Sequence, residues 1–311
     1  MDYLLLLLTI VGLYFISKFS IKALQAYSCY FSSHKKSADM VFLKICSPKK
    51  ESREDKELDR ESRGQESDFK GNIALMSQLI NSLSSMHDGS FKSKFKGEDY
   101  LSFEIAVNDG MIDLYIVAPT SLAKLIEKKV TAFFPDSFIE YSKPYDFIKD
   151  AKHTSACYMQ LKKDSIYPLK SFRNQTGDPF NYISNSLSKF EPGESAVIQL
   201  VITPEDNEWS KEGQKKAKEM LNKEVKDKSL LHSLKFLSII GKFFEFFFTG
   251  ETKDAADDAP ADRKTQVEED EIKLMDEKNT QMGFDSILRI CVAANSSNAA
   301  SMYMKNIKSN Y

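Results

Sequence analysis

Apolar and polar residues alternate with two different periods along the first half of the chain. Runs with a period of two, rich in β-branched and aromatic residues, predict strands at 40–46, 101–108, 111–119 and 137–142. Runs with apolar residues three and four apart predict helices at 69–86 and 121–134. Asp109 and Gly110 lie between the two central strands and indicate a hairpin. The resulting order, β-α-β-β-α-β, is that of a ferredoxin-like unit.

The same order of patterns begins again after residue 150. Strand, helix, strand, strand and helix are expected in turn at 156–163, 179–190, 195–204, 284–294 and 297–311. The last helix corresponds to 121–134 of the first unit, but no strand follows it, so we expect the second unit to lack its last strand. The sequence therefore predicts an α+β fold, and a natural protein that continues past Tyr311 is the favoured explanation of the missing strand.

A long insertion separates the two strands of the second hairpin. We expect a helical arm at 205–282 that contains a very apolar run, 230–248, and an acidic, disordered stretch at 250–264. Lys235, Lys242 and Glu245 fall on a narrow polar stripe of this run. A membrane-surface helix, a helix buried against a partner, and an arm folded back on its own domain all remain open.

The N-terminus carries the clearest single signal in the sequence. No residue from Tyr3 to Ser17 is charged, and a helix continued to Leu24 is roughly 33 Å long at about 1.5 Å per residue. This length is sufficient to cross a bilayer. We therefore expect a transmembrane anchor at 1–30.

The charges around this stretch set its expected orientation. Asp2 precedes the apolar run, while Lys18, Lys22, Lys35 and Lys36 follow it. A cleaved signal peptide, the alternative, has the opposite arrangement. The positive-inside rule predicts a single-pass protein of the inner membrane, with its N-terminus outside and the bulk of the chain cytoplasmic.

The expected domain organisation follows from these patterns and from a highly charged stretch. The boundaries are a transmembrane anchor at 1–30, a first ferredoxin-like unit at 38–150 with a charged linker at 47–68, and a second unit at 151–311 that carries the arm.

Composition excludes several classes of protein. The 43 lysines and arginines nearly balance the 45 aspartates and glutamates of the 311 residues, so a strong nucleic-acid footprint is not expected. The four cysteines lie far apart without a CxxC pair, which argues against a disulfide framework or a cysteine-rich zinc site.

Motifs that carry chemistry are scarce. P-loop, nucleophile-elbow and dinucleotide-binding glycine patterns are absent from the sequence. His153 and Cys157 have the spacing of two metal ligands on a helix, but a strand is expected there. Ser121 and Lys124 have the spacing of a Ser-Lys nucleophile, although a helix cap is the simpler role. We therefore expect no enzyme activity and no catalytic, cofactor-binding or metal-binding residue.

Several segments together resemble a known family. They are "YIVAP" with "KLIEKKVTAFFP", "YPLKSF", the segment from Asp178-Pro179 through Glu194 to Trp209, and the strand from Gly283 to Arg289. With the N-terminal helix, they resemble the uncharacterised membrane-anchored region that precedes helicase-like conjugation or type IV secretion ATPase domains in candidate-phyla-radiation (Patescibacteria) bacteria. These segments are packing and turn signals, so the resemblance carries over no catalytic residue.

The resemblance implies a role in DNA or protein translocation. The expected function is a membrane-anchored, non-catalytic module that docks an ATPase at the cytoplasmic membrane face. Its expected partners are membrane lipid, a P-loop translocase ATPase and further copies of the chain, with nucleic acid contacted only indirectly. The alternative is a membrane-attached scaffold or adaptor unrelated to DNA transport.

Overall fold

The computed structural model describes residues 2–46, 65–108, 110–148, 151–169, 178–206, 208–220 and 266–311. These residues belong to two compact units. The first, here called the sheet unit, comprises Met1–Gln160, Lys170–Asp206 and Gly283–Tyr311, and the second, the arm unit, comprises Leu161–Leu169 and Asn207–Met282. Most of the expected linker, the apolar run at 230–248 and the stretch at 250–264 lie outside the described residues.

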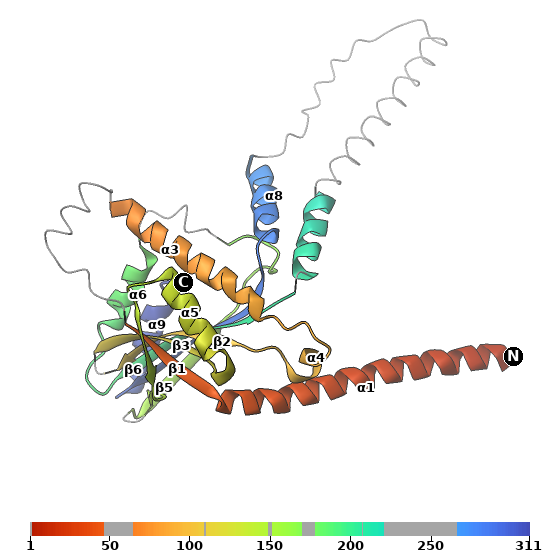
Figure 1. The fold of residues 1–311 in the computed structure, drawn as a ribbon, viewed down its shortest axis with the longest axis horizontal. Coiled ribbons are helices and arrows are strands. Elements are labelled where there is room, and N and C mark those ends of the chain that lie inside the picture. Colours follow the sequence, from red (N-terminus) through yellow and green to blue (C-terminus); the bar gives the residue numbers. More distant parts are fainter. Residues whose placement is uncertain are drawn as a thin grey trace, which may run out of the picture. The chain divides into compact units, whose positions relative to one another are not determined.

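The sheet unit contains one seven-stranded antiparallel sheet, which agrees with the predicted α+β class (Figure 1). The strand order is β4-β1-β3-β2-β6-β7-β5. The strands are β1 Met40–Cys46, β2 Leu101–Asn108, β3 Met111–Pro119, β4 Phe138–Ser142, β5 His153–Met159, β6 Ser195–Pro204 and β7 Phe284–Ala294. Most match the predicted runs closely, but β5 begins at His153 and ends at Met159 instead of occupying 156–163.

The two halves of the sheet meet at β2 and β6. These strands pair along their length, from Leu101 opposite Ile202 to Asn108 opposite Ser195. Each strand would otherwise be the exposed edge of its own half, and edge strands leave backbone N–H and C=O groups without partners. The junction therefore joins four strands of the first half and three of the second into one sheet. Among the described residues, β5 pairs only with β7.

The helices of the sheet unit follow the predicted order with shifted ends. They are α1 Asp2–Ala38, α3 Gln65–Ser82, η1 Leu83–Met86, α4 Ser93–Lys96, η2 Thr120–Leu122, α5 Ala123–Phe133, α6 Pro179–Leu187 and α9 Ser297–Lys308. The expected linker at 47–68 is too long, because α3 already begins at Gln65. Asp178 caps α6, with its Oδ1 accepting from the N–H of Phe180 at 2.9 Å, and Pro179 occupies the first turn as predicted.

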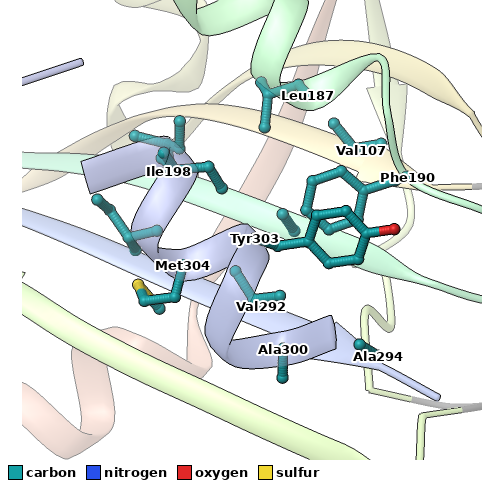
Figure 2. Packing of buried hydrophobic residues seen from close by; sticks show 12 residues of the cluster. Val107, Leu187, Phe190, Ile198, Val292, Ala294, Ala300, Tyr303 and Met304 are labelled. Atoms are coloured by element: carbon teal, nitrogen blue, oxygen red, sulfur yellow. The ribbon is translucent and has the colours of Figure 1, made fainter. Parts of the chain in front are cut away.

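Both helix pairs cover the same face of the sheet. Alternate residues of a strand point to one face, and Leu101 of β2 packs in the cluster under α3 and α5, while Val107 packs in the cluster under α6 and α9. Figure 2 shows the second cluster, in which the ring of Tyr303 stacks on that of Phe190 with centroids 4.1 Å apart. Such a stack adds about 0.5–1.5 kcal/mol to the stabilisation from buried area.

The long N-terminal helix α1 is joined to the sheet at its C-terminal end. Lys36 Nζ lies 2.7 Å from Asp99 Oδ1 and donates to the carbonyl oxygen of Gly97. Asp39, the next residue after α1, accepts at Oδ1 from Thr120 Oγ1 at 2.9 Å. No helix in the part of the chain whose side chains are described combines the length and apolarity needed to cross a membrane. Side chains 1–8 and 10 of α1 lie outside that part.

In the described part of the arm unit, helices occupy 208–220 and α8 Gln266–Asn279, both within the segment predicted as a helical arm at 205–282. Ser210 Oγ donates to the carbonyl oxygen of Asn279, the last residue of α8. Lys278 Nζ donates to the carbonyl oxygens of Ser165 and Tyr167, so the loop at 161–169 is tied to the end of α8. Burial lowers the pKa of Lys278 from its ordinary value.

Candidate functional site

A row of polar and aromatic side chains crosses the sheet on the face opposite the helix pairs. Cross-strand pairing places these residues side by side, one from each strand, in the order Glu140, Lys44, Tyr115, Glu104, Gln199, Arg289 and Tyr158. Side chains directly opposite one another on neighbouring antiparallel strands are close enough to interact. This face, here called the open face, therefore carries a continuous row of polar and aromatic side chains across the sheet.

The segment that follows β4 covers part of the open face. Tyr145 and Phe147 pack with a buried cluster that includes Ala106, Tyr115 and Val197. The ring centroids of Tyr145 and Tyr115 are 5.1 Å apart. A hydrogen bond from a side chain fixes the same segment, because Ser195 Oγ donates to the backbone carbonyl oxygen of Phe147.

A buried carboxylate lies at the centre of the row. Glu104 is 5% exposed, and its Oε2 accepts from the hydroxyl of Tyr145, while its Oε1 accepts from Gln199 Nε2 at 3.0 Å. Burial raises the pKa of Tyr145 above its ordinary value, and the neighbouring Glu104 raises it further. The phenol therefore remains a protonated donor throughout the physiological pH range.

A cavity of about 370 Å³ opens beside Glu104. Its floor is formed by β2 and β6 at the junction between the halves, and the end of α1 contributes to its wall. The lining residues are Ser33, Ser37, Met40, Phe42, Tyr100, Ser102, Glu104, Val117, Gln199, Val201, Thr203 and Arg289. Here we call it the junction cavity.

Among the described residues, one buried polar side-chain atom of the junction cavity has no hydrogen-bond partner. Ser102 is 4% exposed, and its Oγ is buried without a hydrogen bond in the described part of the chain. An unsatisfied buried hydroxyl costs about 1–3 kcal/mol, so native proteins usually pair such groups. The unpaired hydroxyl of Ser102 therefore makes the junction cavity a candidate binding site.

A second cavity, of about 600 Å³, lies on the helix-covered face. Its lining is largely apolar and includes Met76 of α3, Phe180 of α6, Phe103 of β2 and Leu200 of β6. It offers space and apolar contact, but no buried unpartnered side-chain atom faces it among the described residues. The junction cavity is the better candidate for specific recognition, because polar groups at fixed positions determine which ligand fits.

The motif candidates from the sequence lie elsewhere and do not assemble a site. His153 and Cys157 lie on β5, where four residues of extended chain separate their Cα atoms by about 13 Å, too far to share one ion. Ser121 and Lys124 flank the start of α5. The predicted Ser or Thr cap is wrong, because the N-cap residue of α5 is Leu122, and Thr120 instead donates to Asp39.

Glu194, one of the residues on which the family resemblance rests, hydrogen-bonds to the backbone at two places. Its side chain is buried and accepts from the backbone N–H groups of Glu191 and Asn295, at 3.3 and 3.2 Å. It therefore ties the turn before β6 to the end of β7, in keeping with its interpretation as a packing and turn signal.

The residues of the junction cavity were not singled out in the sequence. Ser102 and Glu104 are polar positions of an alternating strand, and such positions are usually solvated. One signal was available. Ser102 and Glu104 fall on the polar side of the predicted strand 101–108, and Gln199 falls on the polar side of the predicted strand 195–204. Nothing local to the sequence indicates that these two strands pair.

A comparison with models of protein families found a match that covers most of the chain. A model described as a domain of unknown function (DUF8128) matches residues 65–311. The chain belongs to this family. The DUF8128 match begins at the first residue of α3, so α1 and β1 precede it, although β1 lies within the sheet. No curated protein and no solved structure matches the chain.

Proposed function

We propose that this DUF8128 protein is a membrane-anchored, non-catalytic docking module of a type IV secretion or conjugation-like translocation system. In this proposal α1 holds the sheet unit at the cytoplasmic face of the inner membrane, where the sheet unit binds a P-loop translocase ATPase. The main support for membrane anchoring is the apolar surface of α1. The translocation partner rests on the resemblance described above.

Exposed apolar side chains surround α1. Leu13, Tyr14, Phe15 and Ile16 are successive residues, and all four are more than half exposed. At about 100° per residue, four successive side chains point to all sides of a helix. A helix that is apolar on every side is buried in a membrane or among other helices. Together with the uncharged run from Tyr3, this surface supports insertion into a bilayer.

Charge and geometry support the proposed orientation. Asp2 lies at one end of α1, and Lys35 and Lys36 lie in its last turn. The positive-inside rule places the lysine end in the cytoplasm. Because Lys36 also binds Asp99 and Gly97, the anchor joins the sheet unit through a defined contact instead of a free linker.

We also propose that each half of the sheet is a ferredoxin-like unit. In the first half the strand order β4-β1-β3-β2 places an antiparallel strand between two strands that are joined by a helix, as in a split β-α-β unit. The second half repeats this order with β5, β7 and β6. The edge of β5 is then a place where a strand of another chain, including a second copy, would be accommodated.

Membrane extraction tests the anchoring. The full chain should stay in the membrane pellet through a carbonate wash, whereas a variant that lacks residues 2–30 should appear in the supernatant. A reporter that is active only in the cytoplasm should be active when it is fused at Tyr311. Activity of a periplasm-dependent reporter at that position would reverse the topology and restore the signal-peptide alternative.

Cross-linking in native membranes tests the partner. We expect the full chain to recover a protein with a P-loop motif. This recovery should be lost when α1 is replaced by an unrelated anchor and the sheet unit is deleted. Recovery only of proteins without a nucleotide-binding motif would favour the scaffold alternative. These outcomes are independent of the extraction result, so the two parts of the proposal fail separately.

A further inference from the structure

The carboxylate of Glu104 can accept more hydrogen bonds than the described residues donate to it. An ionised carboxylate offers about four lone-pair sites. Two are taken, by Tyr145 and Gln199, and both partners are neutral donors. Within the described ranges no lysine, arginine or histidine forms an ion pair with Glu104, although the side chain is buried. A cation that reached Glu104 would form the ion pair that the described residues do not supply, and would offset the cost of burying this carboxylate.

Ser102 lies two residues from Glu104 on the same face of β2 and lines the same cavity. Its unpartnered hydroxyl oxygen can accept one N–H bond. An ammonium group has three N–H donors and no acceptor. One ammonium bound between Ser102 and Glu104 would satisfy the hydroxyl oxygen and neutralise the carboxylate together.

The rest of the junction cavity fits an aliphatic stem. Met40, Phe42, Val117 and Val201 supply apolar wall on the β1 and β6 sides of the polar pair. The aromatic ring of Phe42 adds a surface that attracts a cation. Arg289 belongs to the lining as well and is exposed, so it can donate to carbonyl oxygens of a bound chain.

We propose that the junction cavity binds the side chain of a lysine that a partner protein presents in an extended or loop segment. The ammonium binds Glu104 and Ser102, the methylene stem lies against the apolar wall, and Arg289 donates to the peptide backbone at the mouth. This inference goes beyond the proposed anchoring, because it holds whether or not α1 enters a membrane.

The cavity favours this ligand over two others with related chemistry. A polyamine carries further ammonium groups, and the Arg289 guanidinium at the mouth would repel them. An anion would be attracted by Arg289 but would meet the Glu104 carboxylate. A single cation on an apolar stem, with carbonyl oxygens behind it, matches the polar pair Ser102 and Glu104, the apolar wall and Arg289.

Titration of the full chain in detergent micelles with Nα-acetyl-lysine amide tests the proposal. Binding is followed by the backbone amide NMR signals of Ser102, Glu104 and Gln199 and by the side-chain amide signals of Gln199. The lysine derivative should shift these signals saturably, while Nα-acetyl-norleucine amide, which has the same carbon chain without the ammonium group, should bind at least ten-fold more weakly. Glu104→Gln keeps the volume of the side chain and should weaken lysine binding at least ten-fold.

Matched variants separate a binding defect from a folding defect. Glu140→Gln removes an exposed carboxylate from the same cross-strand row and should leave binding unchanged. Val201→Phe fills the cavity without altering Glu104 and should also abolish binding. Each variant is first checked for an unchanged unfolding transition. Equal binding of the lysine and norleucine derivatives, unchanged binding by Glu104→Gln, or tighter binding of spermidine than of the lysine derivative would overturn the proposal.

Discussion

Gln199 Nε2 donates to Glu104 Oε1 over 3.0 Å, and this bond crosses the one strand pair that joins the two halves of the sheet. Residues 95 positions apart thus form neighbouring parts of one row. The same carboxylate accepts from Tyr145, which belongs to the segment after β4. A single buried glutamate therefore connects three parts of the sheet unit, and its partners determine how much its burial costs.

Tyr145→Phe should destabilise the sheet unit. The substitution leaves Oε2 of Glu104 without its donor in a buried site, and the expected loss is about 1–3 kcal/mol of unfolding free energy. Tyr141→Phe is the matched control, because Tyr141 also bonds a glutamate, Glu127 at 3.2 Å, but on an exposed surface. Urea unfolding should show a control change within about 0.5 kcal/mol. Equal effects of both substitutions would refute the special role of Glu104.

Stability should fall at alkaline pH. Burial raises the pKa of Tyr303 to about 12, with Glu194 adding to the shift, against about 10 in an unfolded chain. The stabilisation from keeping this phenol protonated is fully present below about pH 10 and is lost as the pH rises toward 12. Unfolding measured between pH 8 and 11.5 should show a decline that Tyr303→Phe reduces. The exposed Tyr158, changed to Phe, should leave the decline intact.

Gly213→Ala should destabilise the arm unit. A Cβ at this position would overlap the side chain of Asn279, which is 1% exposed and therefore has little room to move. Overpacking of this kind costs about 1–3 kcal/mol. Hydrogen exchange of the helix at 208–220 and of α8 should become faster, while that of the sheet unit stays unchanged.

Gly71→Ala is the control for that experiment. Gly71 lies within α3, and no atom stands within 4 Å of an added Cβ. Replacing glycine by alanine in a helix interior stabilises by roughly 0.5–1 kcal/mol. The two substitutions should therefore change stability in opposite directions, and a destabilising Gly71→Ala would show that the local environment of α3 is misassigned.

Ile307→Ala should destabilise the second half of the sheet. Ile307 is fully buried between α9 and the strands, and such a truncation costs about 2–5 kcal/mol. Met302 lies on the same helix but is 53% exposed, so Met302→Ala should cost far less. Thermal unfolding of both variants compares them directly, and similar midpoints would contradict the assigned face of α9.

Local patterns were sufficient for most strands and helices. The runs at 40–46, 195–204 and 284–294 became β1, β6 and β7 with the predicted ends, because alternation reports which residues of a strand face a core. The Pro179 signal likewise predicted the first turn of α6. Errors of several residues occurred at β5 and α3, where flanking polar residues leave the ends of the element poorly marked.

The sequence by itself determined the α+β class and the order of the main strands and helices, since each depends on periodicity within a short window. Only the tertiary structure decided that β2 pairs with β6 and that Tyr145 returns to cover Glu104. Pairing between two edge strands depends on complementary edges far apart in the chain, and the position of a loop side chain has no period. The junction cavity lies where β2 pairs with β6, and so no local pattern could predict it.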